Sequence, residues 1–135
     1  MIVVYHHPRC SKSREAVRLV RQAGHRPVLI DYRAEGWTRG HLLGLFAAAG
    51  MTPREALRAK DAASSGIDHA SLSDESLVAE MVRHPALVER PFVCARGGVR
   101  LCRPPERVLE IVRAEGPVFD GDGAPLAGPE GGALA

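Results

Sequence analysis

A cysteine, Cys10, stands at the point where the first expected strand gives way to the first expected helix. Residues 1–5 are apolar and β-prone, and an apolar helical pattern begins at Ala16. The N-terminus of a helix carries free backbone N–H groups and a partial positive charge, which favour an anion. Three cationic side chains add fixed charge around the thiol, namely Arg9, Lys12 and Arg14. The pattern predicts a thiolate nucleophile beside a site that would also hold an oxyanion.

The pKa of the Cys10 thiol is therefore expected to be low. An ordinary cysteine titrates near pH ~8.5, and a helix N-terminus with cationic neighbours brings the pKa to roughly 3.5–7.5. The alternative role is that of a buried apolar filler. That role fits Cys94 and Cys102, which lie in short strand-like runs, better than it fits Cys10, which precedes polar and cationic residues. Ser13 occupies the place of the second cysteine in a C-x-x-C motif, which excludes an internal disulfide there.

Size and composition indicate one globular domain. The chain has 135 residues, of which 45% are hydrophobic, and it shows neither an apolar run of membrane-spanning length nor a secretory signal. Three cysteines argue against a disulfide scaffold and favour a reducing cytoplasm. A net charge of +2 does not call for a nucleic-acid partner.

The first half of the expected fold is a parallel strand–helix–strand unit. Strands are expected at residues 2–5 and 27–32, with a helix from Ser11 to Ala23 that stops at Gly24. The run from 27 to 32 is apolar enough for a central strand. Residues 38–84 are expected to be helical, with a short helix opened by the Thr52–Glu55 capping box and a loop over 61–70.

The second half is expected to be an antiparallel hairpin followed by a helix. The runs 90–95 and 99–102 flank a glycine pair, and Pro104 opens a last helix. This order predicts an α/β, thioredoxin-like fold: a mixed four-stranded sheet flanked by helices, with a helical insert between its βαβ and ββα halves. The domain is expected over residues 1–115, the insert over about 38–85 and a loosely ordered tail over 116–135. In that fold a cis-proline lies across from the reactive cysteine, so Arg90–Pro91 is expected to be cis.

Four separate segments resemble the glutaredoxin-coupled arsenate reductases, a family related to the Spx-type regulators. The resemblance runs from Met1 to about Arg113, and the segments that carry it are Tyr5–Arg14, Ala56–Arg58, His84–Pro91 and Leu101–Glu106. The family reduces arsenate to arsenite in arsenic detoxification. It uses glutathione as co-substrate and glutaredoxin as partner, with no bound cofactor. The resemblance therefore implies an oxidoreductase acting on arsenate.

The resemblance also implies roles for individual residues. Cys10 aligns with the catalytic cysteine, and the three oxyanion-binding arginines align with Arg58, Arg90 and Arg103. Guanidinium groups offer paired donors to a tetrahedral oxyanion, and all three arginines lie at the ends of expected elements, where sites are built. The alternative for each arginine is a solvated surface charge.

The histidines beside Cys10 leave more than one interpretation. His6 aligns with the family histidine that helps to tune the thiolate, and its alternative is a strand-end side chain in water. His7 replaces the usual asparagine, a departure that could alter the pKa of the nucleophile. His6, His7 and Cys10 could suggest zinc, but zinc usually takes four ligands, or three and a water, and no fourth partner is evident. No metal is expected.

Two other functions fit the same expected fold. An Spx-like regulator would bind RNA polymerase, and many of those proteins carry the C-x-x-C switch that Ser13 excludes here. A glutathione-dependent thiol reductase would not act on arsenate and would not need three arginines. The arginine set therefore favours arsenate reduction.

Overall fold

The computed structural model describes residues 1–127. These residues divide into two compact units, each of which we describe by itself. The first contains residues 1–31 and the chain from Arg90 onward, and the second contains Tyr32–Glu89. The second unit corresponds to the insert expected over about 38–85, with both boundaries moved outward. No helix among the described residues has the length and apolar character needed to cross a bilayer.

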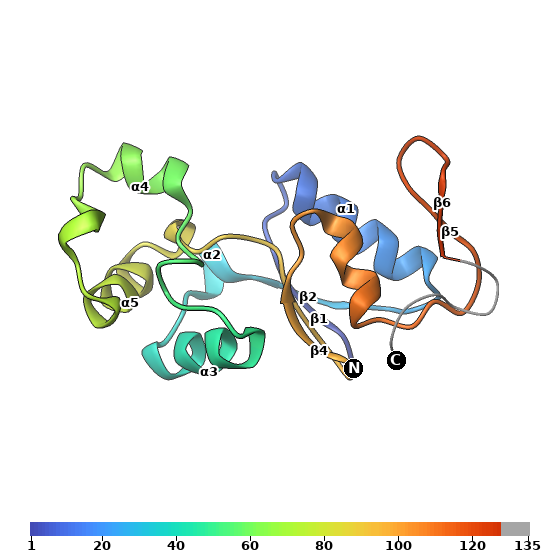
Figure 1. Cartoon of the computed structure of the whole chain (residues 1–135), viewed down its shortest axis with the longest axis horizontal. Helices are drawn as coiled ribbons and strands as arrows, with labels where there is room; N and C mark the ends of the chain where they lie inside the picture. Colours follow the sequence, from blue (N-terminus) through green and yellow to red (C-terminus); the bar gives the residue numbers. More distant parts are fainter. Residues whose placement is uncertain (128–135) are drawn as a thin grey trace. The chain divides into compact units, whose positions relative to one another are not determined.

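The first unit contains the expected mixed sheet of four strands. Its members are β1 (Val3–His6), β2 (Val28–Asp31), β3 (Phe92–Ala95) and β4 (Gly98–Leu101), in the order β2-β1-β3-β4 (Figure 1). Strand β1 pairs parallel with β2 and antiparallel with β3, and β3 pairs antiparallel with β4. This topology is the thioredoxin-like arrangement that the sequence predicts.

Strand β2 is an edge strand, so the expectation of a central strand is wrong. It pairs with β1 and stands at the end of the sheet order. Val28 is 45% exposed and Leu29 is 38% exposed. The apolar run satisfies the pattern of a buried strand, but only the global topology decides which strand has a neighbour on both sides.

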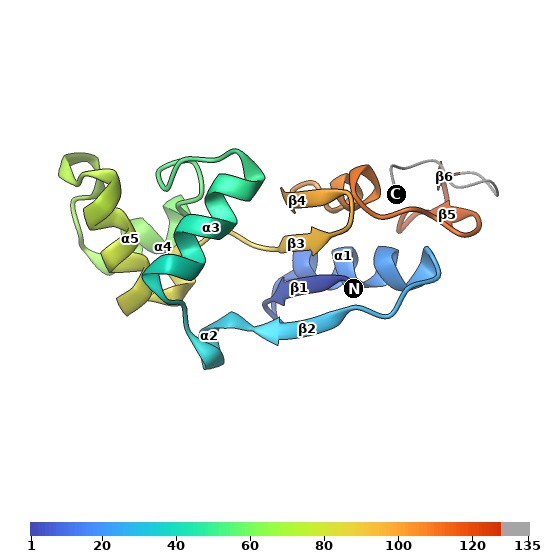
Figure 2. The ribbon, with the colours of Figure 1, turned by 90° about the horizontal axis from the view of Figure 1, so that it is seen from below.

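Helix α1 (Ser11–Gln22) and the 3-10 helix η3 (Pro105–Glu110) share one hydrophobic core with the sheet (Figure 2). Helix α1 contributes residues spaced as one face of an amphipathic helix, namely Ala16, Val17, Leu19 and Val20, all buried. The last helix was expected to be α-helical and is instead a 3-10 helix. Apolar residues three apart, such as Val108 and Ile111, fit both helix types, so the sequence pattern does not separate them.

A short hairpin follows the core, where the sequence predicted a loosely ordered tail. Strands β5 (Val118–Phe119) and β6 (Pro125–Ala127) pair antiparallel. The backbone of Phe119 is tied to α1 at both polar groups: its N–H donates to Gln22 Oε1 at 2.7 Å, and its carbonyl accepts from Arg18 at 2.8 Å. These bonds join residues about 100 positions apart in the chain, which a local pattern cannot reveal. The remainder of the expected tail, residues 128–135, lies outside the described residues.

The second unit is helical. It contains α2 (Tyr32–Glu35), α3 (Arg39–Ala49), α4 (Ala59–Ser65), η1 (His69–Ser71), α5 (Asp74–Arg83) and η2 (Pro85–Leu87). Thr38 caps α3 by accepting from His41 N–H at 3.1 Å. The largest fully buried side chains of this helical unit include Tyr32, Phe46, Leu42, Leu77 and Met81.

Two local expectations in this unit are wrong. The loop expected over 61–70 begins instead with most of α4, whose small residues are compatible with a helix although they show little apolar periodicity. The Thr52–Glu55 capping box forms both reciprocal bonds, at 2.8 Å and 3.2 Å, yet a turn follows it, and the next helix, α4, begins only at Ala59. The chain turns because Leu57 forms a β-bridge with Val88, and that long-range pairing replaces a helical continuation.

Candidate functional site around Cys10

Cys10 is the N-cap residue of α1. Its backbone is extended (φ −89°, ψ 121°), its N–H donates to His7 O at 3.0 Å, and its carbonyl accepts from Arg14 N–H at 3.0 Å. The cap position places the thiol against the unpaired N–H groups of the first helical turn. The strand–turn–helix placement predicted from the sequence is therefore observed.

The pKa of Cys10 is lowered from the ordinary value of a cysteine. Partial burial of the thiol opposes this by raising the pKa, but nearby hydrogen-bond donors outweigh that effect. These donors are the backbone N–H of Ser13, the Arg90 side chain, the backbone N–H of Lys12 and the Arg103 side chain, whose Nη1 lies within hydrogen-bond distance of the sulfur. Hydrogen bonds to the charged form favour that form, so the site stabilises a thiolate.

Two of the three predicted arginines reach this thiol. Arg103 Nη1 lies 3.8 Å from Cys10 Sγ and donates to Arg90 O at 2.9 Å, which ties the two arginines together. Arg90 comes two residues before β3, and Arg103 comes two residues after β4. Because β1 pairs with β3 and β3 with β4, the sheet brings both arginines to the strand end from which the Cys10 loop departs. The Arg90–Pro91 peptide bond is cis, as the topology predicted.

The His6–Ser13 pair fixes the loop that carries Cys10. Ser13 is fully buried, and its hydroxyl bonds His6 Nδ1 at 2.7 Å and accepts from His7 N–H at 3.0 Å. Burial lowers the pKa of His6, with Asp31 opposing this and two arginines adding to it. The lowered pKa favours the neutral form of His6, whose bond to Ser13 holds the turn.

Arg14 also contacts the loop that carries Cys10. Its guanidinium donates to Pro8 O at 3.1 Å. The tuning of the thiolate by His6 and Arg14 thus stays a prediction. Sequence reasoning missed Ser13 as a polar anchor, although a serine in the first turn of a predicted helix is a recognisable capping signal.

The other two thiols are poorly suited to chemistry. Burial raises the pKa of Cys94, and burial raises the pKa of Cys102 to about 12. Cys102 is fully buried in the core of the unit. Cys10 is therefore the one thiol among residues 1–127 whose surroundings favour ionisation.

Arg58 belongs to the helical unit Tyr32–Glu89. Its guanidinium pairs with Asp61 at 2.7 Å and with Glu89 at 2.9 Å, two carboxylates that the sequence analysis did not single out. The backbone around it is also held, since Arg58 N–H donates to Leu87 O at 2.7 Å. The role of Arg58 as a third oxyanion-binding arginine stays a prediction.

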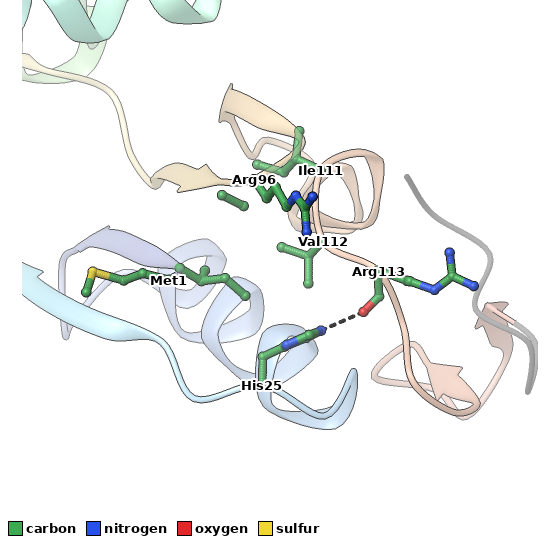
Figure 3. Close-up of a pocket in the computed structure, with 8 residues that line it drawn as sticks. Met1, His25, Arg96, Ile111, Val112 and Arg113 are labelled. Carbon is green, nitrogen blue, oxygen red and sulfur yellow. Dashed lines mark hydrogen bonds between the residues drawn. The ribbon is translucent and has the colours of Figure 1, made fainter. Parts of the chain in front are cut away.

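A separate pocket of about 180 Å³ lies at the opposite strand ends of the sheet unit (Figure 3). Its lining includes Met1 and Ile2, which precede β1, whereas Cys10 follows β1. His25 Nε2 donates to Arg113 O at 2.6 Å, and the Arg113 side chain points away from the other lining residues. The lining contains no thiol and no carboxylate, so this pocket offers little chemistry. Residues 1–127 also contain no group of three or more His, Cys, Asp or Glu side chains placed to hold a metal ion.

Residues 5–111 match the ArsC family, which covers more than half of the chain and includes Cys10, Arg58, Arg90 and Arg103. The chain belongs to the ArsC family. The match confirms the family relationship that the four sequence segments indicated.

Known relatives of this ArsC-family chain include named arsenate reductases. Arsenate reductase ArsI2 of Synechocystis is 48% identical over 114 residues, covering 83% of this chain and 81% of its own length. An arsenate reductase of Rhizobium meliloti is 41% identical over 126 residues, covering 90% of each protein. A solved arsenate reductase from Vibrio cholerae superposes with a TM-score of 0.72 at 38% identity, covering 82% of this chain and 97% of that one.

Proposed function

We propose that this protein reduces arsenate to arsenite, with Cys10 as the nucleophile. The observation that carries the proposal is a thiol at the N-cap of α1 that accepts a hydrogen bond from Arg103 and whose pKa is lowered by the donors of Arg90, Arg103 and the first helical turn. Relatives at 41–48% identity that are named arsenate reductases support the choice of oxyanion. The residue roles come from this geometry together with the family resemblance.

The cationic surroundings serve two needs of the reaction. Arsenate is an anion, so an attacking thiolate would be repelled unless positive charge lies between and around the two groups. Arg90 and Arg103 supply forked donors that suit tetrahedral oxyanions, and the helix N-terminus adds partial positive charge. The same donors that lower the pKa of Cys10 thus also favour binding of the substrate beside it.

The chemistry proceeds in two covalent steps. The Cys10 thiolate attacks arsenic and forms an S–As bond, and one arsenate oxygen leaves as water after protonation, with arsenic still pentavalent. The thiolate of glutathione then attacks the Cys10 sulfur and forms an S–S bond. The S–As bond breaks, and its electron pair passes to arsenic, which leaves as trivalent arsenite.

The electrons must come from thiols outside the chain. Ser13 stands where a C-x-x-C partner would be, and the raised pKa values of Cys94 and Cys102 make them poor attacking groups. Glutathione supplies the first thiol. Glutaredoxin then resolves the Cys10–glutathione disulfide by thiol–disulfide exchange and returns the Cys10 thiolate.

A coupled assay tests this function. Purified protein is mixed with arsenate, glutathione, glutaredoxin, glutathione reductase and NADPH, and arsenite is quantified alongside NADPH oxidation. We expect arsenate-dependent turnover in the wild type and in Cys94→Ala, and none in Cys10→Ser. NADPH oxidation that needs no arsenate but accompanies reduction of an added disulfide would favour the thiol-reductase alternative. No turnover of either substrate, together with capture of purified RNA polymerase, would favour the regulator.

A further inference from the structure

A groove of about 390 Å³ lies along α1 in the unit that carries Cys10. Its volume falls within the range of roughly 300–1,000 Å³ that is usual for small-molecule sites. Helix α1 lines it with Arg14, Val17, Arg18 and Arg21. The remaining lining residues are His6, Pro8 and Leu29. We call this feature the α1 groove.

The charge of the α1 groove is positive. Arg14, Arg18 and Arg21 follow the i, i+4, i+7 spacing that places residues on one helix face. Glu15 pairs with Arg18 at 2.6 Å, and burial lowers the pKa of His6, although the nearby Asp31 opposes this. Arg21 is exposed and has no carboxylate partner among residues 1–127, and Arg14 bonds only a backbone carbonyl. The groove therefore favours a ligand with carboxylate groups at more than one point.

The length of the charged face suits a tripeptide. Arg14 and Arg21 are seven residues apart, which corresponds to about 10 Å along a helix. An extended chain of three residues spans about the same distance. A tripeptide with a carboxylate near each end could pair with both guanidinium groups at once.

The α1 groove also begins beside the nucleophile. Cys10 is one helical turn before Arg14, and Arg14 N–H donates to the Cys10 carbonyl. Arg14 further holds Pro8, a member of the Cys10 loop that lines the groove. The oxyanion donors Arg90 and Arg103 flank β3 and β4, whereas Leu29 of the groove belongs to β2, on the other side of β1 in the sheet order. A thiol held in the groove would therefore approach Cys10 from the β2 side.

We propose that the α1 groove binds glutathione, the anionic thiol tripeptide that attacks the Cys10 adduct. This inference rests on the proposed function, because it assigns a place to the co-substrate of that reaction. The groove is a recess of small-molecule size, which favours the tripeptide over the acidic face of a partner protein. Arg21 is then a binding residue for glutathione, at the end of the groove far from Cys10.

The test measures binding of S-methylglutathione, which lacks a free thiol and so cannot react. Titration calorimetry compares the wild type with Arg21→Glu and with a matched control, Arg26→Glu, at an exposed arginine of the same unit outside the groove. We expect Arg21→Glu to weaken binding about fivefold or more, because one attraction becomes a repulsion. The control should bind like the wild type. Equal binding by wild type and Arg21→Glu, or no binding to the wild type, would overturn the assignment.

Steady-state kinetics separates this inference from the proposed function. Arg21→Glu should raise the KM for glutathione about fivefold while leaving unchanged the KM for arsenate and the rate with 2-mercaptoethanol, a neutral thiol. A raised KM for glutaredoxin alone would mean that the surface binds an acidic protein, and the inference would be wrong. If no arsenate is reduced but S-methylglutathione binding still depends on Arg21, the groove assignment stands and the arsenate proposal fails.

Discussion

At the scale of residues, the site depends on the balance of effects at one sulfur. Burial alone would raise the pKa of Cys10, and the donors around it reverse that tendency. Two of these donors are backbone N–H groups of α1, which any residue except proline could supply at those positions. The other two are guanidinium groups, so the contribution of side chains can be removed by substitution and measured.

The pH dependence of Cys10 alkylation should show this balance. Only the thiolate reacts, so the rate of modification by iodoacetamide rises with pH and is half-maximal at the pKa. Because the pKa of Cys10 is lowered, we expect a midpoint below the ~8.5 of an ordinary cysteine. Arg103→Ala removes one donor and should move the midpoint to higher pH, whereas Arg26→Ala should not. A wild-type midpoint at or above that of a free cysteine would contradict the account.

Arg58 allows a test of the role that the family resemblance implies. If Arg58 binds the oxyanion, Arg58→Ala should raise the KM for arsenate about tenfold, as expected for loss of a charge-assisted hydrogen bond. The same change also removes the pairs with Asp61 and Glu89. The urea midpoint of the variant therefore serves as the control for folding. An unchanged KM in a folded variant would assign Arg58 to the ion-pair network alone.

At the scale of elements, the β3–β4 turn packs closely against the backbone of the segment that follows η3. A Cβ atom at Gly97 would lie 2.7 Å from Ile111 O and 2.9 Å from Ile111 Cα. Both are backbone atoms that cannot move aside as a flexible side chain would. Gly97, the first glycine of the pair that predicted a hairpin from the sequence, is thus also required by packing.

A pair of glycine substitutions tests this approach. Gly97→Ala should lower the free energy of unfolding by about 1–3 kcal/mol, the usual effect of overpacking. Gly44→Ala, in the exposed interior of α3 with open space around it, should raise that free energy by about 0.5–1 kcal/mol. Urea denaturation with an unchanged m-value measures both. Equal effects of the two changes would refute the steric argument.

Elements that depend on local pattern were predictable from the sequence, and those that depend on distant partners were not. The residues that determine the first strand, the Cys10 turn and the amphipathic face of α1 lie close together in the sequence, so each pattern is visible without knowledge of the fold. The edge position of β2 depends on the whole sheet order. The β5–β6 hairpin depends on bonds from Phe119 to Arg18 and Gln22 of α1, which no periodicity reveals.

The same distinction holds for the site. Cys10 was found from its place between a predicted strand and a predicted helix, whereas Arg90 and Arg103 were found from the family resemblance and lie at the ends of predicted elements. Ser13 was recognised only as a missing second cysteine. Its hydroxyl bonds with His6 and His7 need coordinates to be seen. The carboxylates that pair with Arg58 were missed for the same reason.

At the scale of the whole molecule, the sheet unit holds the nucleophile and both arginines that contact it, whereas Arg58 belongs to the helical unit. The fold, the lowered pKa of a single thiol and the membership of the ArsC family all support one reaction sequence. In the reaction that we propose, Cys10 and glutathione form a disulfide intermediate, and this disulfide forms only after arsenate has reacted. Neither the regulator nor the thiol reductase would need arsenate to form it.

Intact-protein mass spectrometry of this intermediate tests the central claim most directly. Wild-type protein is mixed with glutathione, with and without arsenate, in the absence of glutaredoxin, and the modified peptide is mapped. We predict one glutathione per chain, attached at Cys10, formed in step with arsenite and only when arsenate is present. Arsenite released without modification of Cys10, or glutathione found on Cys94 or Cys102 instead, would contradict the account.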